Sequence, residues 1–311
     1  MTKKLYISLL ITAICFSFAS CISDNECAKS NRLSVSFVAD IENRNLQTRS
    51  TKSGFSENDN IGIYMVDYNN DASMPIGTIS EFMNAEHIYN GNFWYSKNGE
   101  ELYLTTDQTK ADLYAYYPFD YEMSRVSGKT DLRAYPFNVE KDQSLSSQKS
   151  DFLWAKYSGL SGSNTIAKLT FKHILTKVII NLTYGNLGNG TEPILIHNLT
   201  REALIDMENG NVFNTGLNSN SDIIPFIHYE ANKGFDKTLS AIIIPQFVDS
   251  GTSIFSVNIN DELYAFIMEN PILFESGYSY TFNLIIGEAN TRSTKTASTE
   301  KRVSLVSKTS F

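Results

Sequence analysis

The chain has 311 residues and a formal net charge of −8 at pH 7, with 42% hydrophobic and 12% aromatic residues. This length allows two domains or one large β domain, and the many aromatic residues favour sheets over helical bundles. The charge argues against nucleic-acid binding, because no basic field is available to neutralise phosphates. No cysteine follows Cys27, which excludes a disulfide framework and a Cys-x-x-Cys metal site from the rest of the chain.

The first 20 residues have the pattern of a signal peptide. Two lysines precede an apolar run over residues 5–18, which is too short for a comfortable transmembrane helix. The segment Phe18-Ala19-Ser20-Cys21 resembles a bacterial lipobox, in which cleavage before the cysteine leaves its thiol to carry diacylglycerol. We therefore expect a signal peptide over 1–20, acyl chains that anchor Cys21 in a membrane, and a polar tether over 21–32. An ordinary secretory signal with an incidental cysteine is the alternative.

A half-buried strand is predicted over residues 33–41. Its odd-numbered residues are apolar and alternate with mostly polar ones. The following segment, 43–54, is polar, basic and without periodicity, so it should be exposed to proteases. The strand is therefore either an ordinary first strand or one that proteolysis can remove.

Further strands are expected over 60–66, 93–95, 102–104 and 112–119, the last of which should end at Pro118. Residues 120–150 are polar and irregular. The composition of 158–164 is that of a loop, and the first domain is expected to span 33–160.

The stretch from Leu169 to Thr183 has a period of two that slips by one residue near its middle. This pattern predicts a strand with a bulge near Leu175–Lys177. The apolar residues also fit the spacing of a helix, but the β-branched residues 178–180 favour a strand. This strand is expected to open a second domain over 165–287.

Two hairpins and a long strand are predicted in the second domain. One hairpin turns at Asn209-Gly210, between 203–207 and 212–213. The other joins 255–259 to 263–268, and the clearest alternation follows over 278–286. Short strands at this spacing, with turn signals between them, are typical of a β-sandwich.

The C-terminal segment 288–311 begins as a polar leash that should not fold alone. It ends in an amphipathic strand in which Val303, Leu305 and Phe311 are expected to share one face. Such a strand needs a partner edge.

No catalytic residue, metal site or cofactor is expected. The four histidines lack metal-ligand spacing, and no nucleophile or phosphate-binding motif is present. Asp67 to Asp71 is interpreted as a solvated turn. Glycan binding is a competing hypothesis, with stacking candidates Trp94, Tyr95, Tyr116 and Tyr117, most of which are expected to lie in the core.

Five segments occur in the order and spacing seen in fimbrillin-like proteins: 58–65, 112–118, 151–155, 169–178 and 242–246. The chain thus resembles the subunits of type V pili of anaerobic Gram-negative bacteria, over residues 33–287. The resemblance implies two tandem transthyretin-like (Ig-like) β-sandwich domains and display on the outer membrane as a lipoprotein. It also implies that an arginine-specific protease removes the first strand and that a neighbouring subunit fills the groove with its C-terminal strand.

Carried over residue by residue, the resemblance implies lipidation of Cys21 and cleavage between Arg49 and Ser50, with Arg44 less favoured. The donor strand would present Val303, Leu305 and Phe311. The expected partners are other pilus subunits, the outer membrane through the lipid anchor, and a host or bacterial surface ligand. The alternative function is a surface-anchored glycan-binding lipoprotein that does not polymerise.

Overall fold

The computed structural model describes residues 32–42, 54–76, 82–125, 131–185, 193–217, 222–259, 262–286 and 301–311. Strands dominate, and the helices in these ranges are three short 3-10 turns: η1 (Tyr121–Arg125), η2 (Leu132–Ala134) and η3 (Gln148–Ser150). None of the described helices is long and apolar enough to cross a membrane. The expected all-β fold is confirmed. Cys21, Arg44, Arg49 and Ser50 lie outside the described residues.

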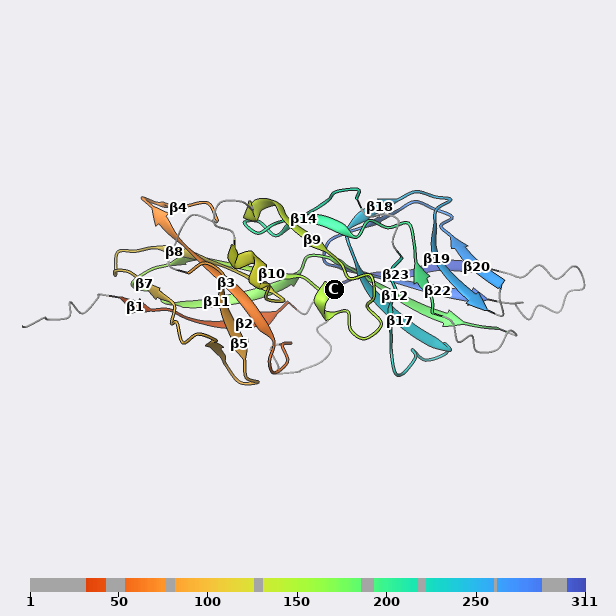
Figure 1. Cartoon of the computed structure of the whole chain (residues 1–311), viewed down its shortest axis with the longest axis horizontal. Helices are drawn as coiled ribbons and strands as arrows, with labels where there is room; N and C mark the ends of the chain where they lie inside the picture. Colours follow the sequence, from red (N-terminus) through yellow and green to blue (C-terminus); the bar gives the residue numbers. More distant parts are fainter. Residues whose placement is uncertain are drawn as a thin grey trace, which may run out of the picture.

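The molecule is elongated, and its strands gather in two halves along the long axis (Figure 1). The N-terminal half contains an eight-stranded sheet in the order β2-β11-β10-β8-β3-β5-β6, with β4 paired to β3, and a small sheet of β1 and β7. These strands are β1 (Leu33–Ser34), β2 (Ser36–Ile41), β3 (Asn60–Asn69), β4 (Ala72–Ser73), β5 (Ala85–Tyr89), β6 (Trp94–Ser96), β7 (Tyr103–Leu104), β8 (Ala111–Tyr117), β10 (Leu153–Leu160) and β11 (Ile166–His173).

The C-terminal half is built from three sheets, with orders β16-β17-β12-β22-β23, β13-β19-β20 and β18-β21. Their strands are β12 (Thr176–Thr183), β13 (Leu195–Ile196), β16 (Phe226–Ile227), β17 (Lys237–Ile243), β18 (Gln246–Val248), β19 (Ser253–Ile259), β20 (Glu262–Ile267), β21 (Ile272–Phe274), β22 (Tyr278–Ile286) and β23 (Lys301–Ser310). The inward residues of β12 and β22 are apolar and fully buried, as their alternation predicts.

The central strands of the N-terminal sheet are covered on both faces. Tyr64 on β3 and Tyr116 on β8 belong to one hydrophobic cluster, whereas Ile63 and Ala115 belong to another. Neighbouring residues of a strand point to opposite faces, so each face packs on its own core. The cluster that contains Tyr64 continues into the C-terminal half, and the two halves therefore share a core.

A further sheet joins the halves through backbone hydrogen bonds. It has the order β15-β14-β9, so β9 (Tyr135–Asn138) pairs with β14 (Glu202–Asp206), which also pairs with β15 (Asn211–Asn214). Gln143, which is fully buried, accepts from the backbone N–H of Ile242 at 2.9 Å and donates to its carbonyl at 2.8 Å. These contacts hold the two halves as one unit.

The expected strand over 169–183 is confirmed as β structure, but the expected bulge is wrong. The chain forms two strands, β11 and β12, in different sheets, and buried Ile174 and Leu175 link them. The period slips because β11 buries odd-numbered residues such as Leu169 and Phe171, whereas β12 buries the even-numbered Val178, Ile180 and Leu182. Since β11 pairs with β10 and β2, it lies in the N-terminal sheet, not at the start of the second domain as expected.

One predicted turn and one predicted strand end are confirmed, and a predicted loop is shorter than expected. Gly210 ends the β14–β15 turn with φ of +72°, and a Cβ there would come within 2.7 Å of the Trp154 ring. β8 ends immediately before Pro118. β10 extends to Leu160, so only a tight turn over 161–164 remains of the expected loop.

Candidate functional site

The first strand lies at an edge and joins two sheets. β1 pairs antiparallel with β7, and β2 pairs in parallel with β11, from Ser36 opposite Ile166 to Ile41 opposite Phe171. β2 is the edge strand of the eight-stranded sheet. If residues 33–41 left, the edges of both β7 and β11 would lose their backbone partners.

Burial along this strand alternates as predicted. Val35 and Ala39 are buried, while Leu33, Phe37 and Ile41 are half-buried against the same cluster. Val38, between them, is 58% exposed. We call the groove under residues 33–41 the first-strand groove, and the strand that now fills it is apolar at all five inward positions.

Aromatic rings form one wall of the first-strand groove. The Phe37 ring packs edge-on against His87, with centroids 5.2 Å apart, and lies 6.3 Å from Trp94. Phe55 packs edge-on against both Trp94 and Phe171, at 5.0 and 5.2 Å. Burial lowers the pKa of His87 and favours its neutral form at this wall.

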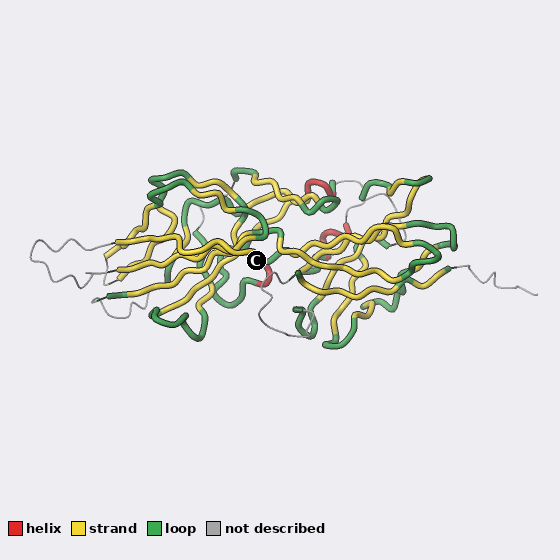
Figure 2. The backbone as a smooth tube through the Cα atoms, turned by 180° about the vertical axis from the view of Figure 1, so that it is seen from behind, coloured by secondary structure: helices red, strands yellow, loops and turns green. Residues whose placement is uncertain are grey.

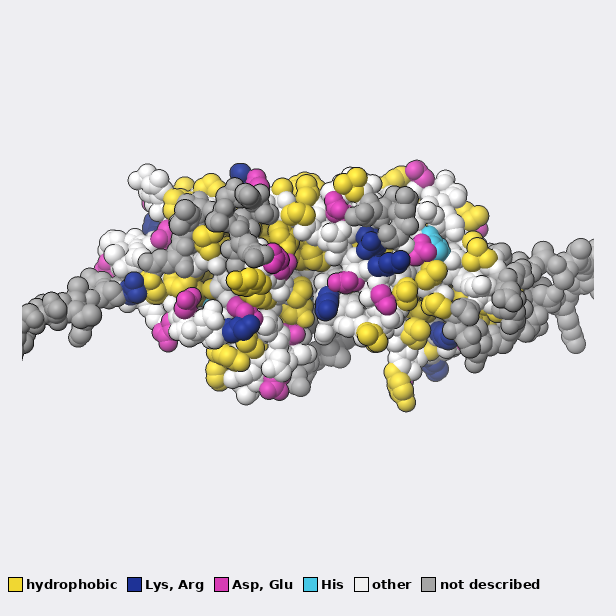
Figure 3. All heavy atoms as spheres, in the orientation of Figure 1, with side chains coloured by type: hydrophobic (Ala, Val, Ile, Leu, Met, Phe, Trp, Pro, Cys, Tyr) yellow, Lys and Arg dark blue, Asp and Glu magenta, His cyan; other side chains and the backbone are white. Residues whose placement is uncertain are grey.

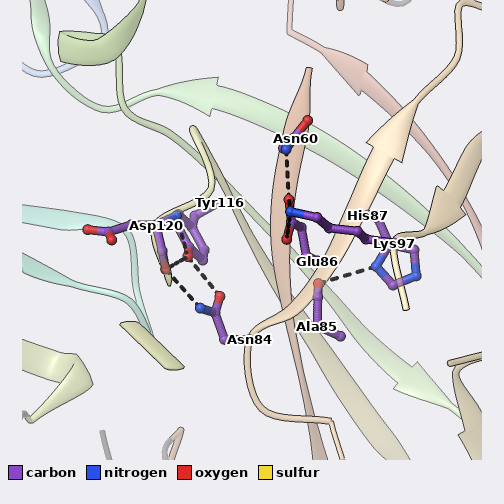
Figure 4. A network of polar contacts seen from close by, with 8 residues as sticks. All are labelled: Asn60, Asn84, Ala85, Glu86, His87, Lys97, Tyr116 and Asp120. Carbon is purple, nitrogen blue, oxygen red and sulfur yellow. Dashed lines mark hydrogen bonds and ion pairs between the residues drawn. The ribbon is translucent and has the colours of Figure 1, made fainter. Parts of the chain in front are cut away.

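Polar contacts fix the hairpin that carries this wall (Figure 4). Asn60 Nδ2 and Lys97 Nζ donate to Glu86 Oε1 at 2.8 and 2.9 Å, which ties β5 to β3 and to the end of β6. Just before β5, the Tyr116 hydroxyl lies 2.7 Å from Asn84 Oδ1. None of these polar contacts involves residues 33–41.

The C-terminal strand pairs within its own chain. β23 lies antiparallel to β22 at the edge of the sheet, with Val303 opposite Leu284 and Leu305 opposite Phe282. The register shifts at Val306, and Leu305 and Val306 are 47% and 56% exposed. The middle of β23 therefore buries little apolar surface.

The end of β23 is held more firmly than its middle. The Phe311 ring stacks on His173, with centroids 3.7 Å apart, and Lys177 Nζ lies 4.9 Å from its centroid. Lys308 Nζ binds Glu275 Oε1 at 2.6 Å and lies over the Tyr278 ring. We call these contacts of Lys308 and Phe311 the C-terminal clamp. Figure 2 shows the end of the chain near the middle of the molecule, where the halves meet.

The expectation that Leu305 and Phe311 share one face is wrong for this arrangement. The irregularity at Val306 changes the alternation, so Lys308 falls opposite Tyr280, on the face of Leu305. Phe311 instead packs on His173 and Lys177.

His197 contacts Asp222 through Nδ1 and Ser256 through Nε2, beside a cavity of about 430 Å³. A carboxylate, an imidazole and a hydroxyl are linked in the same way in the catalytic triad of serine hydrolases. Ser256, however, is 4% exposed and lies mid-strand, paired to β13 on one side and β20 on the other. In α/β-hydrolases, by contrast, the nucleophilic serine sits on a sharp exposed turn beside backbone N–H groups that bind the oxyanion. We therefore interpret these contacts as a structural link between β13 and β19.

The sequence profile of the fimbrillin-like family matches residues 48–301. The chain belongs to the fimbrillin-like family. The resemblance inferred from the five segments is confirmed. No curated protein matches the chain.

Two solved structures resemble this fimbrillin-like chain in fold. One is a candidate cell adhesion protein from Bacteroides ovatus ATCC 8483, with a TM-score of 0.64 and 19% identity over 90% of this chain and 98% of that chain. The other is a candidate cell adhesion protein from Bacteroides uniformis ATCC 8492, with a TM-score of 0.60 and 18% identity over 89% of this chain and 98% of that chain. At these identities the likeness shows the fold alone.

The four stacking candidates for glycan binding do not form one platform. Tyr116 is fully buried, and Tyr117 is half-buried with its hydroxyl 3.1 Å from Asp59 Oδ1. Trp94 is half-buried beside Tyr89, whereas Tyr95 is 43% exposed. Of the four, Trp94 and Tyr95 line a cavity of about 410 Å³, together with residues 34–37 of the first strand.

Sequence reasoning missed Phe55, His87 and the C-terminal clamp. Phe55 follows a polar linker and has no apolar neighbour in sequence that would indicate a strand. His87 lies on β5, which was not predicted. The Phe311–His173 contact joins residues 138 positions apart, and a contact at such separation leaves no local pattern.

Proposed function

We propose that this chain is a structural or adhesive subunit of a cell-surface pilus, assembled by proteolytic removal of the first strand and donor-strand exchange. Family membership supports the pilus role. The observation that carries the exchange step is the position of residues 33–41. They form an edge strand between two sheets, apolar at every inward position and followed by the basic linker.

Cleavage between Arg49 and Ser50 would separate the first strand from the body with little disturbance. The cut would fall between Glu42 and Gly54, the nearest described residues on either side. Phe55 is 7% exposed and packs in the core of the body, so it would hold the new N-terminus in place. Arg44 is the less favoured site.

Removal of the strand would leave unpaired backbone groups and an apolar slot, which another strand can fill. Residues 303–311 are the segment that this chain would donate to the next subunit. In support, β23 is an edge strand whose middle is exposed, and its end adds the contacts of Lys308 and Phe311 to the backbone pairing with β22. Release of the strand would require the β22–β23 ladder to open together with the C-terminal clamp.

Lipidation of Cys21 would place the chain on the outer membrane, with residues 21–32 as the tether. Among the described residues on the face drawn in Figure 3, basic side chains lie among acidic ones and form no continuous basic field that would bind an anionic surface. The lipid and the strand-mediated contacts would supply the attachment. An adhesive role would add a host or bacterial surface ligand.

A surface-anchored glycan-binding lipoprotein that does not polymerise is the second candidate. The exposed Tyr95 ring beside the cavity of about 410 Å³ favours it, because sugar rings stack on exposed aromatic faces. A first strand that is never removed would suit this function.

The two functions separate in an experiment on surface material. For a pilus subunit we expect chains that begin at Ser50 and SDS-resistant ladders, and both should be lost in Arg49→Ala but kept in the matched control Arg44→Ala. Chains that begin only at Cys21, without ladders, would contradict the pilus proposal. N-terminal sequencing and gel electrophoresis read out both results.

A further inference from the structure

We infer that the first-strand groove accepts a donor strand from a different pilus subunit, not the C-terminal strand of a second copy of this chain. The inference rests on the proposed strand exchange and identifies the partner. It follows from what the groove binds now and from what residues 303–311 could offer.

The present occupant fills every inward position with an apolar side chain. The series is Leu33, Val35, Phe37, Ala39 and Ile41. Its central member, Phe37, is the largest and packs between His87 and Trp94. The groove is therefore shaped for an aromatic ring at its centre.

The C-terminal strand of this chain does not supply that pattern. Its corresponding alternate residues are Val303, Leu305, Ser307, Thr309 and Phe311. When residues 303–311 take the place of residues 33–41, Ser307 falls at the position of Phe37, whether the strand runs in the same direction or in the opposite one. A hydroxyl would then replace a ring between His87 and Trp94, with a cavity beside it.

Shifting the register does not remove the mismatch. A shift of two that brings Leu305 to the centre places Ser307 at a neighbouring inward position and Lys301 and Thr309 at the two ends. The opposite shift brings Thr309 to the centre. A one-residue shift would turn the other face inward, and that face has Val306 as its only apolar member. Each arrangement puts polar side chains at two or more of the five positions.

The outer rim of the groove disfavours the same strand. Lys168 on β11 lies opposite Val38, its ammonium is 3.7 Å from a carboxylate oxygen of Asp40, and Lys172 further along β11 is exposed. In the parallel nine-for-nine alignment, Lys308 would stand directly opposite Lys168, and like charges in that position repel. The present occupant carries the acidic residues Asp40 and Glu42, whose negative charge is opposite to that of Lys168 and Lys172.

The partner strand is thus defined by its chemistry. It has apolar residues at five alternate positions, an aromatic or large aliphatic one at the third, and an acidic residue on the outward face near Lys168. A strand of this kind belongs to another subunit, so this chain joins unlike neighbours in the pilus.

Competition on the full chain, cleaved in the linker by an arginine-specific protease, tests the inference. The probe is a fluorescent peptide of residues 32–42, and the competitors are unlabelled 32–42, unlabelled 301–311, and 301–311 with Ser307→Phe. The matched control is 301–311 with Ser310→Phe, which adds the same ring on the other face. Fluorescence polarisation measures displacement of the probe.

We expect the 301–311 peptide to compete on the order of 100-fold more weakly than 32–42, as befits loss of a buried ring. Ser307→Phe should recover at least tenfold and Ser310→Phe should recover nothing. If unmodified 301–311 competes as well as 32–42, the partner is a second copy and the inference is overturned. If labelled 32–42 fails to enter the cleaved chain, strand exchange itself is wrong, and the inference falls with it.

Discussion

His87 shows how one buried group makes the first-strand groove sensitive to pH. Burial lowers its pKa below the ordinary value of 6.5, so the folded chain binds fewer protons than the unfolded chain as the pH falls through that value. The stability that comes from neutral His87 is therefore complete above pH 6.5. It is lost as the pH falls toward the lowered pKa.

We predict that acidification from pH 7.5 to 5.0 lowers the melting temperature less in His87→Gln than in the unmodified chain. His228, whose pKa burial also lowers, stays in both proteins, so the difference isolates His87. Thermal unfolding followed by circular dichroism measures it. If the melting temperatures of both proteins fell equally, protonation of His87 would not contribute to the loss of stability at low pH, which would contradict the prediction.

We also predict that Cys21 is the residue that carries the lipid. Cys21→Ala should abolish acyl labelling, because the thiol that would carry the lipid is gone, and once the signal peptide is cut away the chain should be released from membranes. Cys27→Ala is the matched control and should label normally. Metabolic labelling with a palmitate analogue reads out the result, and unchanged labelling of Cys21→Ala would exclude this anchor.

Among the elements, β23 pairs with β22 along its length, and the C-terminal clamp adds the side-chain contacts of Lys308 and Phe311 at its end. Phe311→Ala removes a ring that stacks on His173 and should cost about 1–2 kcal/mol of local stability. The cleavage of β23 by trypsin at Lys301 and Arg302 should become faster. Leu305→Ala, which alters a side chain that is 47% exposed, should change the rate little.

Limited proteolysis at low trypsin concentration compares these variants, with circular dichroism as the control for global folding. Equal cleavage rates for Phe311→Ala and Leu305→Ala would show that the end of β23 is no firmer than its middle.

The elements also show how far sequence reasoning reaches. Alternation over 33–41 and 278–286 predicts strands correctly, because half-buried strands select apolar residues by face. Pairing partners depend on distant segments, so the parallel contact of β2 with β11 could not be predicted. The slip in 169–183 was visible in the sequence, but a bulge and a change of sheet produce the same slip. In residues 303–311, Val306 is an apolar residue at an even position, whereas Val303 and Leu305 lie at odd ones. This departure from alternation indicated the irregularity in β23, and it was missed.

At the scale of the whole molecule, the shared core and the β15-β14-β9 sheet make the two halves one elongated body. The first-strand groove belongs to the N-terminal half and β23 to the C-terminal half. An elongated unit with its proposed acceptor in one half and its proposed donor in the other can join end to end, and such head-to-tail contacts build an open filament when the rotation between neighbours does not close a ring. The expected domain bounds of 33–160 and 165–287 stay a prediction apart from β11, which lies in the N-terminal sheet.

Strand exchange requires the first strand to leave its groove, and a reversible covalent lock on that strand tests whether it does. Ser36 and Ile166 are exposed neighbours on β2 and β11, at a spacing that a disulfide can span. In a Cys27→Ser background, Ser36→Cys with Ile166→Cys should trap the strand even after the linker is cut. Electron microscopy of surface filaments labelled for this chain is the measurement, with Ser36→Cys alone as the control. We predict that the locked chain is absent from filaments and enters them once a reductant opens the disulfide; normal incorporation with the disulfide intact would contradict strand exchange.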